Sequence, residues 1–130
     1  MPDYKIRPLK GKAAFDSVFK GGKRFKNDSM HAVVRFDKEQ QLPAVVLCGI
    51  VVRKKIAKTA VLRNRIKRLA RESLFAVAKT QPELIAHIES MVVLWNTTPE
   101  HPRKIELEDV QAVVTDALHK AQEFYHNRLR

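Results

Sequence analysis

The chain has 130 residues, 45% of them apolar, which fits a single domain (residues 1–130) with a modest core. No apolar run reaches the roughly 18 residues of a membrane span, and the basic N-terminus lacks the apolar segment of a secretory signal. A single cysteine, Cys48, excludes an internal disulfide and indicates a reducing, cytoplasmic setting.

The net charge of +11 is concentrated in residues 1–71, which carry 19 basic and 5 acidic side chains. Such a concentration of positive charge predicts a polyanionic partner.

The first half of the chain predicts one helix and two strands. Residues 1–11 are expected to form a flexible basic arm. Residues 12–20 place apolar side chains at helical spacing, and Gly21-Gly22 then ends that helix. Residues 31–36 have the composition of a strand. Residues 43–52 form a nearly continuous β-branched run, typical of a strand buried on both faces, with Cys48 as a small core residue.

Residues 53–71 hold nine lysines and arginines and no acidic residue. Thr59 is expected to cap a helix that runs from there to about residue 79. At 100° per residue, one face within about 60° of Ile66 is apolar or small: Leu62, Ile66, Leu69, Ala70, Ser73 and Val77. Arg63 and Arg65 flank this face, and four polar residues point away from it: Asn64, Lys67, Arg68 and Arg71. The pattern predicts a helix that docks by one face and offers nucleic acid the other, although a solvated basic face without a ligand remains an alternative.

The second half predicts a strand and a long helix. Residues 82–90 are ambiguous and include a candidate short helix, whereas residues 91–95 are a further apolar strand. Residues 96–104, with two prolines, are expected to be a loop, and an amphipathic helix begins at about Glu106 with acidic residues in its first turn. The order is helix, two or three strands, helix, strand, helix, which predicts an α+β sandwich.

No constellation of catalytic or metal-binding residues stands out. The five histidines are scattered and form no HxxxH motif, and Gly21-Gly22 lacks the Lys and Ser or Thr of a phosphate-binding loop. No nucleophile stands beside a plausible base. We therefore expect no catalytic residues, no metal held by protein side chains, and no nuclease activity of the protein alone.

Two segments resemble motifs of a known family. The first is Lys54-Lys55-Ile56-Ala57-Lys58-Thr59-Ala60-Val61-Leu62-Arg63-Asn64-Arg65-Ile66-Lys67-Arg68-Leu69-Ala70-Arg71-Glu72, and the second is Phe15-Asp16-Ser17-Val18-Phe19-Lys20-Gly21-Gly22. They are similar to the basic signature and to the Phe-x-x-Val-Phe element of the bacterial ribonuclease P protein subunit. The order of the remaining elements also matches, so the resemblance covers nearly the whole chain.

The resemblance implies a subunit of an endoribonuclease whose RNA is catalytic. Members bind that RNA, expected here in a 1:1 complex, and help it remove the 5′ leader from precursor tRNA. Magnesium is required through the RNA. The fold implied places the basic helix in a left-handed crossover between parallel strands, against the usual rule.

The resemblance also implies two sets of site residues. Contact with the catalytic RNA is assigned to Arg63, Asn64, Arg65, Lys67, Arg68 and Arg71. Contact with the leader is assigned to Phe15, Phe19, Arg53, Lys54 and Lys55. Two alternatives stay open: Arg63 pairs locally with a carboxylate or carbonyl, and the two phenylalanine rings are buried core. Arg65 and Arg68 are expected to anchor RNA and not to stabilise the fold.

Several positions depart from the family pattern. Arg53 stands where Ser is common, and Ala57 where Gly is usual, so a turn that needs positive φ would be strained or replaced. Residues 33–34 are valines where many members have an aromatic ring, and His31 or Phe36 is a candidate substitute.

Two rival functions remain. A ribosomal or other structured-RNA-binding protein without a role in cleavage would share the basic composition and the α+β layout. A helix-turn-helix DNA regulator would need two short helices around a turn, whereas here a long apolar strand precedes the basic helix.

Overall fold

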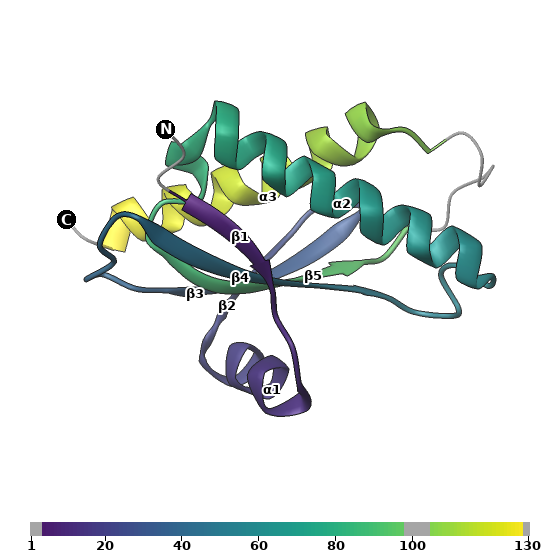
Figure 1. The fold of residues 1–130 in the computed structure, drawn as a ribbon, viewed down its shortest axis with the longest axis horizontal. Helices are drawn as coiled ribbons and strands as arrows, with labels where there is room; N and C mark the ends of the chain where they lie inside the picture. The colour runs from purple at the N-terminus through teal and green to yellow at the C-terminus, as the bar shows by residue number, and fades with distance from the viewer. Residues whose placement is uncertain (1–3, 98–104, 129–130) are drawn as a thin grey trace.

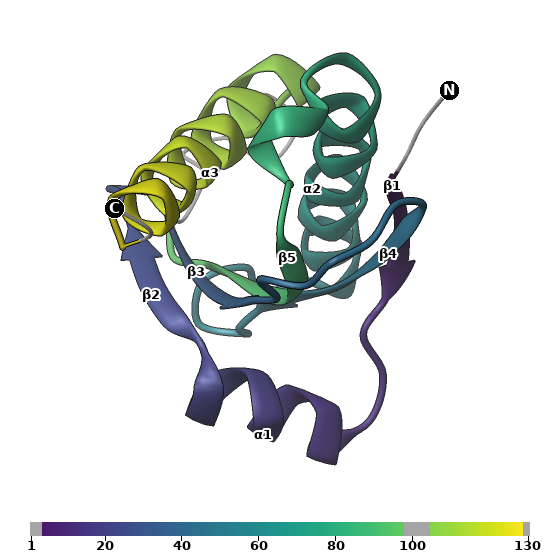
Figure 2. The same cartoon turned by 90° about the vertical axis from the view of Figure 1, so that its left-hand side faces the viewer.

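A computed structural model describes residues 4–97 and 105–128, which form a five-stranded sheet with helices on both faces (Figures 1 and 2). The α+β class is confirmed. The elements in chain order are β1 (Tyr4–Pro8), α1 (Lys12–Gly21), β2 (Lys23–Lys26), β3 (Met30–Phe36), β4 (Ala44–Val52), α2 (Ala60–Thr80), the 3-10 turn η1 (Pro82–Leu84), β5 (Ile88–Trp95) and α3 (Leu107–Arg128).

The strands lie in the order β1-β4-β5-β3-β2. β1, β4 and β5 are parallel, β3 runs antiparallel to β5, and β2 runs antiparallel to β3. α2 connects the parallel neighbours β4 and β5. Viewed from the α2 side with these strands pointing upward, β5 lies to the left of β4, so the crossover is left-handed (Figures 1 and 2). This rare hand is the one expected above.

The core has two unequal layers. α2 and α3 cover one face of the sheet and α1 covers part of the other (Figure 2). The smaller layer, between α1 and the sheet, is built on four buried residues: Leu9, Val18, Val33 and Val92. The short α1 therefore leaves some of its side of the sheet uncovered, and Val45 and Leu47 of β4 are 51% and 37% exposed there.

The basic helix forms as its pattern predicts. Thr59 accepts a hydrogen bond at its hydroxyl from the backbone N–H of Leu62 (3.1 Å), which confirms the N-terminal cap. All six residues of the predicted apolar face are buried. The polar side of α2 consequently faces solvent over 21 residues.

Two short strands were not predicted. Residues 4–8, expected to belong to a flexible arm, pair with β4 instead, so that part of the prediction is wrong. The four residues of β2 pair with β3. In the ambiguous segment 82–90, a single 3-10 turn precedes β5, which begins at Ile88. Most of the predicted loop 96–104 lies outside the described residues.

Ala57 requires no strained turn. Among the described residues, positive φ occurs only at Gly11 and His87. Ala57 is instead 1% exposed in the larger core layer, and its N–H donates to the carbonyl of Arg53 (3.1 Å). An alanine therefore fits this position without the freedom of glycine.

None of the helices in the described ranges has the length and hydropathy needed to cross a membrane.

The first prediction concerns Cys48, which is buried in β4. Burial raises the pKa of its thiol to about 12, and the thiol form is a poor nucleophile. The native protein at pH 8 should therefore react with a disulfide reagent far more slowly than the same protein in denaturant, as followed by release of the coloured thiolate. A fast reaction of the native protein would show that β4 is open.

Candidate nucleic-acid interface

The outer face of α2 carries cations without nearby counter-charges. Asn64, Arg68 and Arg71 are exposed, and Lys67 is half-buried. In the described part of the chain the one ion pair within 4.0 Å is Lys120–Asp116, on α3. The positive charge of α2 is therefore available to an external anion.

Arg63 contacts the loop that precedes its own helix. Its Nη1 donates to the carbonyl oxygens of Ala57 (3.0 Å) and Lys58 (3.3 Å). The alternative of local pairing with a carbonyl is thus confirmed. Since this loop begins at the basic turn after β4, Arg63 also fixes the connection between that turn and α2.

Arg65 connects α2 to the segment before α3. Its Nη2 donates to the carbonyl oxygen of Ile105 (2.7 Å), and its Nε is buried without a hydrogen-bond partner in residues 4–97 and 105–128. The expectation that Arg65 has no part in stabilising the fold is therefore wrong. A charged donor on a backbone carbonyl is a structural contact. Arg68 makes no such bond to another described residue.

The two rings of α1 lie against the sheet and remain half-buried. Phe15 packs over Gly49, where a Cβ atom would come within 2.5 and 2.6 Å of the ring. Phe19 lies beside Arg24 of β2, whose guanidinium carbon is 6.0 Å from the ring centroid. Both rings therefore join the smaller core layer and still present an accessible part of their surface.

The strand register places His31 and Phe36, the two candidates to replace the aromatic ring absent at residues 33–34, on opposite faces of the sheet. His31 is opposite Leu94 of β5, on the α1 side of the sheet. Phe36 lies on the other side, with its ring 4.9 Å from that of Tyr125 on α3. Of the two candidates, only His31 is on the α1 face.

The basic turn lies beyond Phe15 along β4. Arg53, Lys54 and Lys55 are all exposed and follow the end of the strand. Gly49, beneath Phe15, is four residues before Arg53, or roughly 13 Å along an extended strand. The structure thus places Phe15 and the basic turn in succession along β4, whereas Phe19 lies beside β2 at the other side of the sheet.

Other cations on the α1 side were not predicted. Lys5 and Arg7 of β1 are opposite the exposed Val45 and Leu47 of β4. The alternation of Tyr4 and Ile6 with these two cations is a strand signal that could have revealed them. On the far edge strand β2 and on its neighbour β3, further basic side chains lie on the same side of the sheet: Arg24 and Lys26 of β2, and Arg35 of β3. Both edges of the α1 face are therefore basic.

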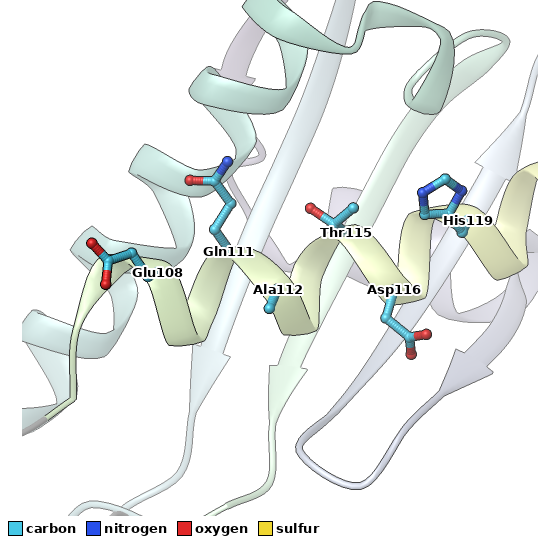
Figure 3. A pocket seen from close by; sticks show the side chains of 6 residues that line it. All are labelled: Glu108, Gln111, Ala112, Thr115, Asp116 and His119. Atoms are coloured by element: carbon cyan, nitrogen blue, oxygen red, sulfur yellow. The ribbon is translucent and has the colours of Figure 1, made fainter.

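The outer face of α3 differs in charge. A shallow depression of about 600 Å³ is lined by Glu108, Gln111, Ala112, Thr115, Asp116 and His119. Figure 3 shows these residues spread along successive turns of one helix. A hydrogen bond from Asn27 lowers the pKa of Asp116 and keeps it charged. Within residues 4–97 and 105–128, no group of three or more His, Cys, Asp or Glu side chains could hold a metal ion. The carboxylates of Glu108 and Asp116 make this face less suited to phosphate than the outer face of α2.

Comparison with known proteins gives a consistent set of relatives. A family model described as Ribonuclease P matches residues 4–122. The ribonuclease P protein component of Prochlorococcus marinus is 35% identical over 74 residues, which cover 51% of this chain and 58% of that protein. That of Microcystis aeruginosa is 29% identical over 89 residues, covering 68% of this chain and 72% of the relative.

Solved structures of RNase P proteins also resemble this chain. The RNase P protein of Staphylococcus aureus superposes with a TM-score of 0.67 at 27% identity, covering 88% of this chain and 94% of that chain. The RNase P protein of Thermotoga maritima gives a TM-score of 0.68 over 88% and 96% of the two chains. At 22% identity the latter likeness concerns the fold alone.

The geometry of the two arginines predicts different effects on stability. Arg65→Ala removes the bond to Ile105 and should lower the free energy of unfolding by about 1–3 kcal/mol. Arg68→Ala, at an exposed site, should change it by less than about 0.5 kcal/mol. Urea unfolding followed by circular dichroism measures both. Equal losses in the two variants would contradict the assignment.

Proposed function

Because the chain belongs to the ribonuclease P protein family, we propose that it binds the catalytic RNA and the 5′ leader of precursor tRNA, and so supports RNA-catalysed removal of that leader. The observation that carries the proposal is the outer face of α2, where cations stand without counter-charges among the described residues. A polyanion is the partner that such a surface fits.

The catalytic RNA is proposed to lie on the outer face of α2. Arg68 and Arg71 present guanidinium groups that suit phosphate oxygens and stacked bases, and Asn64 can both donate and accept. Lys67 adds a point charge beside them. Arg63 and Arg65 serve this surface by holding α2 on its neighbouring segments, and each keeps further donors for RNA.

The leader is proposed to cross the α1 face. The half-buried rings of Phe15 and Phe19 offer surfaces on which bases stack without sequence preference. Arg53, Lys54 and Lys55 lie further along β4, where they meet phosphates. His31 lies on the same face and supplies a third flat ring.

In this proposal the chemistry belongs to the RNA. Magnesium ions held by the RNA supply the hydrolysis of the phosphodiester bond. The protein's side chains supply positive charge, which lowers the repulsion between two RNA molecules. One protein per catalytic RNA and a cytoplasmic site of action are part of the proposal.

The protein should stimulate leader cleavage most strongly at limiting magnesium. Basic side chains neutralise phosphates that magnesium otherwise screens, so the gain in rate should shrink as the magnesium concentration rises. Cleavage of end-labelled precursor tRNA by the cognate RNA, with and without protein, measures this. Equal rates at limiting magnesium, or cleavage by the protein alone, would contradict it.

A fourth prediction separates the leader from the rest of the substrate. Phe19→Ala combined with Lys54→Ala should weaken binding of precursor tRNA to the holoenzyme by about 1–3 kcal/mol for the ring. Binding of mature tRNA, which has no leader, should be unchanged. Filter binding with both tRNAs provides the measurement.

The matched control replaces Lys79, an exposed lysine in the last turn of α2, by alanine. This variant removes a charge of the same kind outside the proposed leader surface. Circular dichroism checks that the double variant keeps its helices. Equal weakening toward both tRNAs would assign Phe19 and Lys54 to the core or to the catalytic RNA.

A further inference from the structure

We propose that a separate pocket at the β2 edge of the sheet binds a nucleotide of single-stranded RNA. This edge pocket has a volume of about 400 Å³ and is lined by Gly21, Lys23, Val34, Phe36, Lys38, Phe124, Tyr125 and Arg128. That volume lies within the range of small-molecule sites. The pocket belongs to neither surface assigned above.

One wall of the edge pocket is aromatic and held in place by ring contacts. The ring centroid of Phe36 is 4.9 Å from that of Tyr125, and Phe124 lies 5.6 Å from Phe25. Tyr125 in turn stacks on His87 at 4.8 Å. Phe36 and Phe124 remain half-buried. The cluster therefore offers fixed, partly accessible ring surface, which suits a planar base.

Among the described residues, the charged side chains that line the edge pocket are all positive. They are Lys23, Lys38 and Arg128, and no described Asp or Glu side chain joins them. None of the three is in an ion pair with another described residue. Lys23 Nζ is 5.9 Å and the Arg128 guanidinium carbon 5.1 Å from the Phe124 centroid. A ligand that fits must combine a flat apolar group with negative charge, as a nucleotide does.

The position of the edge pocket suits a strand of RNA that passes around the sheet. In β2, Lys23 and Phe25 face the α3 side, and the alternate residues Arg24 and Lys26 face the α1 side. Cations on the two faces are thus one residue apart along the chain. In Figure 2 the C-terminal end of α3 lies above β2, at the opposite edge of the sheet from β1. The pocket is therefore separate from the α2 surface and adjoins the α1 face.

The test uses the protein alone and a short oligouridylate that contains one 4-thiouridine. Irradiation should cross-link the oligonucleotide to residues of the edge pocket, identified by mass spectrometry. Phe124→Leu, which keeps apolar volume and removes the ring, should weaken binding about tenfold and reduce that cross-link. Lys38→Gln, at an exposed site, should weaken binding and make its salt dependence shallower.

Each variant has a matched control on α2. Phe75 is 49% exposed and Lys79 is exposed. Phe75→Leu therefore removes an aromatic ring, and Lys79→Gln removes a lysine charge, at sites outside the edge pocket. Both controls should leave the pocket cross-link unchanged. Lys38→Gln keeps the test decisive if Phe124→Leu fails to fold. Cross-links confined to other surfaces would overturn the proposal, as would an equal loss of the pocket cross-link in Lys38→Gln and Lys79→Gln. Displacement of the RNA from the pocket by an acidic peptide at lower concentration would also overturn it.

The source of the nucleotide is distinguished in the holoenzyme. If the leader supplies it, Lys38→Gln should weaken binding of precursor tRNAs with long leaders and spare those with short ones. If the catalytic RNA supplies it, the same variant should weaken assembly with that RNA whatever the substrate. Because the oligonucleotide experiment needs neither RNA component, its result is independent of the proposed role in leader cleavage.

Discussion

Burial of β5 on both faces is the constraint on which the rest of the structure depends. Met91, Val92 and Val93 are fully buried, and successive side chains of a strand point to opposite faces, so both sides of the sheet need an apolar cover. α2 and α3 provide the larger cover and keep their polar sides outside. The ten-residue α1 provides the smaller cover and leaves basic sheet edges open. The surfaces proposed to bind RNA are therefore those that core formation leaves exposed.

The boundary between the core and the proposed RNA surface runs along α2, where single side chains are placed to serve both. Arg63 and Arg65 flank the apolar face of α2, and each donates a hydrogen bond to a backbone carbonyl of a residue outside this helix. A guanidinium has five N–H donors, so one or two such bonds leave others free for phosphate. Structural and RNA-binding roles are therefore compatible at these positions, and loss of RNA affinity in a variant needs a separate measure of stability.

Sequence pattern predicted the long elements because their own side chains specify them. α2 has a continuous apolar face and a Thr59 cap, and β4 is a β-branched run. The four- and five-residue strands β2 and β1 instead depend on the partners that β3 and β4 offer, and tertiary pairing overrides their weak local signal. Likewise, exposure of Arg68 followed from helical geometry, but the bond from Arg65 to Ile105, 40 residues away, depends on how α3 packs.

The scarcity of ion pairs links the stability of the free protein to its partner. With a formal net charge of +11 and one ion pair among the described residues, the folded chain holds its cations close together without neutralising them. Compaction then carries a repulsive cost, which a bound polyanion removes. Salt acts in opposite directions on the two states, because it screens repulsion in the free protein and weakens phosphate contacts in the complex. Additional internal ion pairs would stabilise the free chain by occupying cations that are proposed to bind RNA.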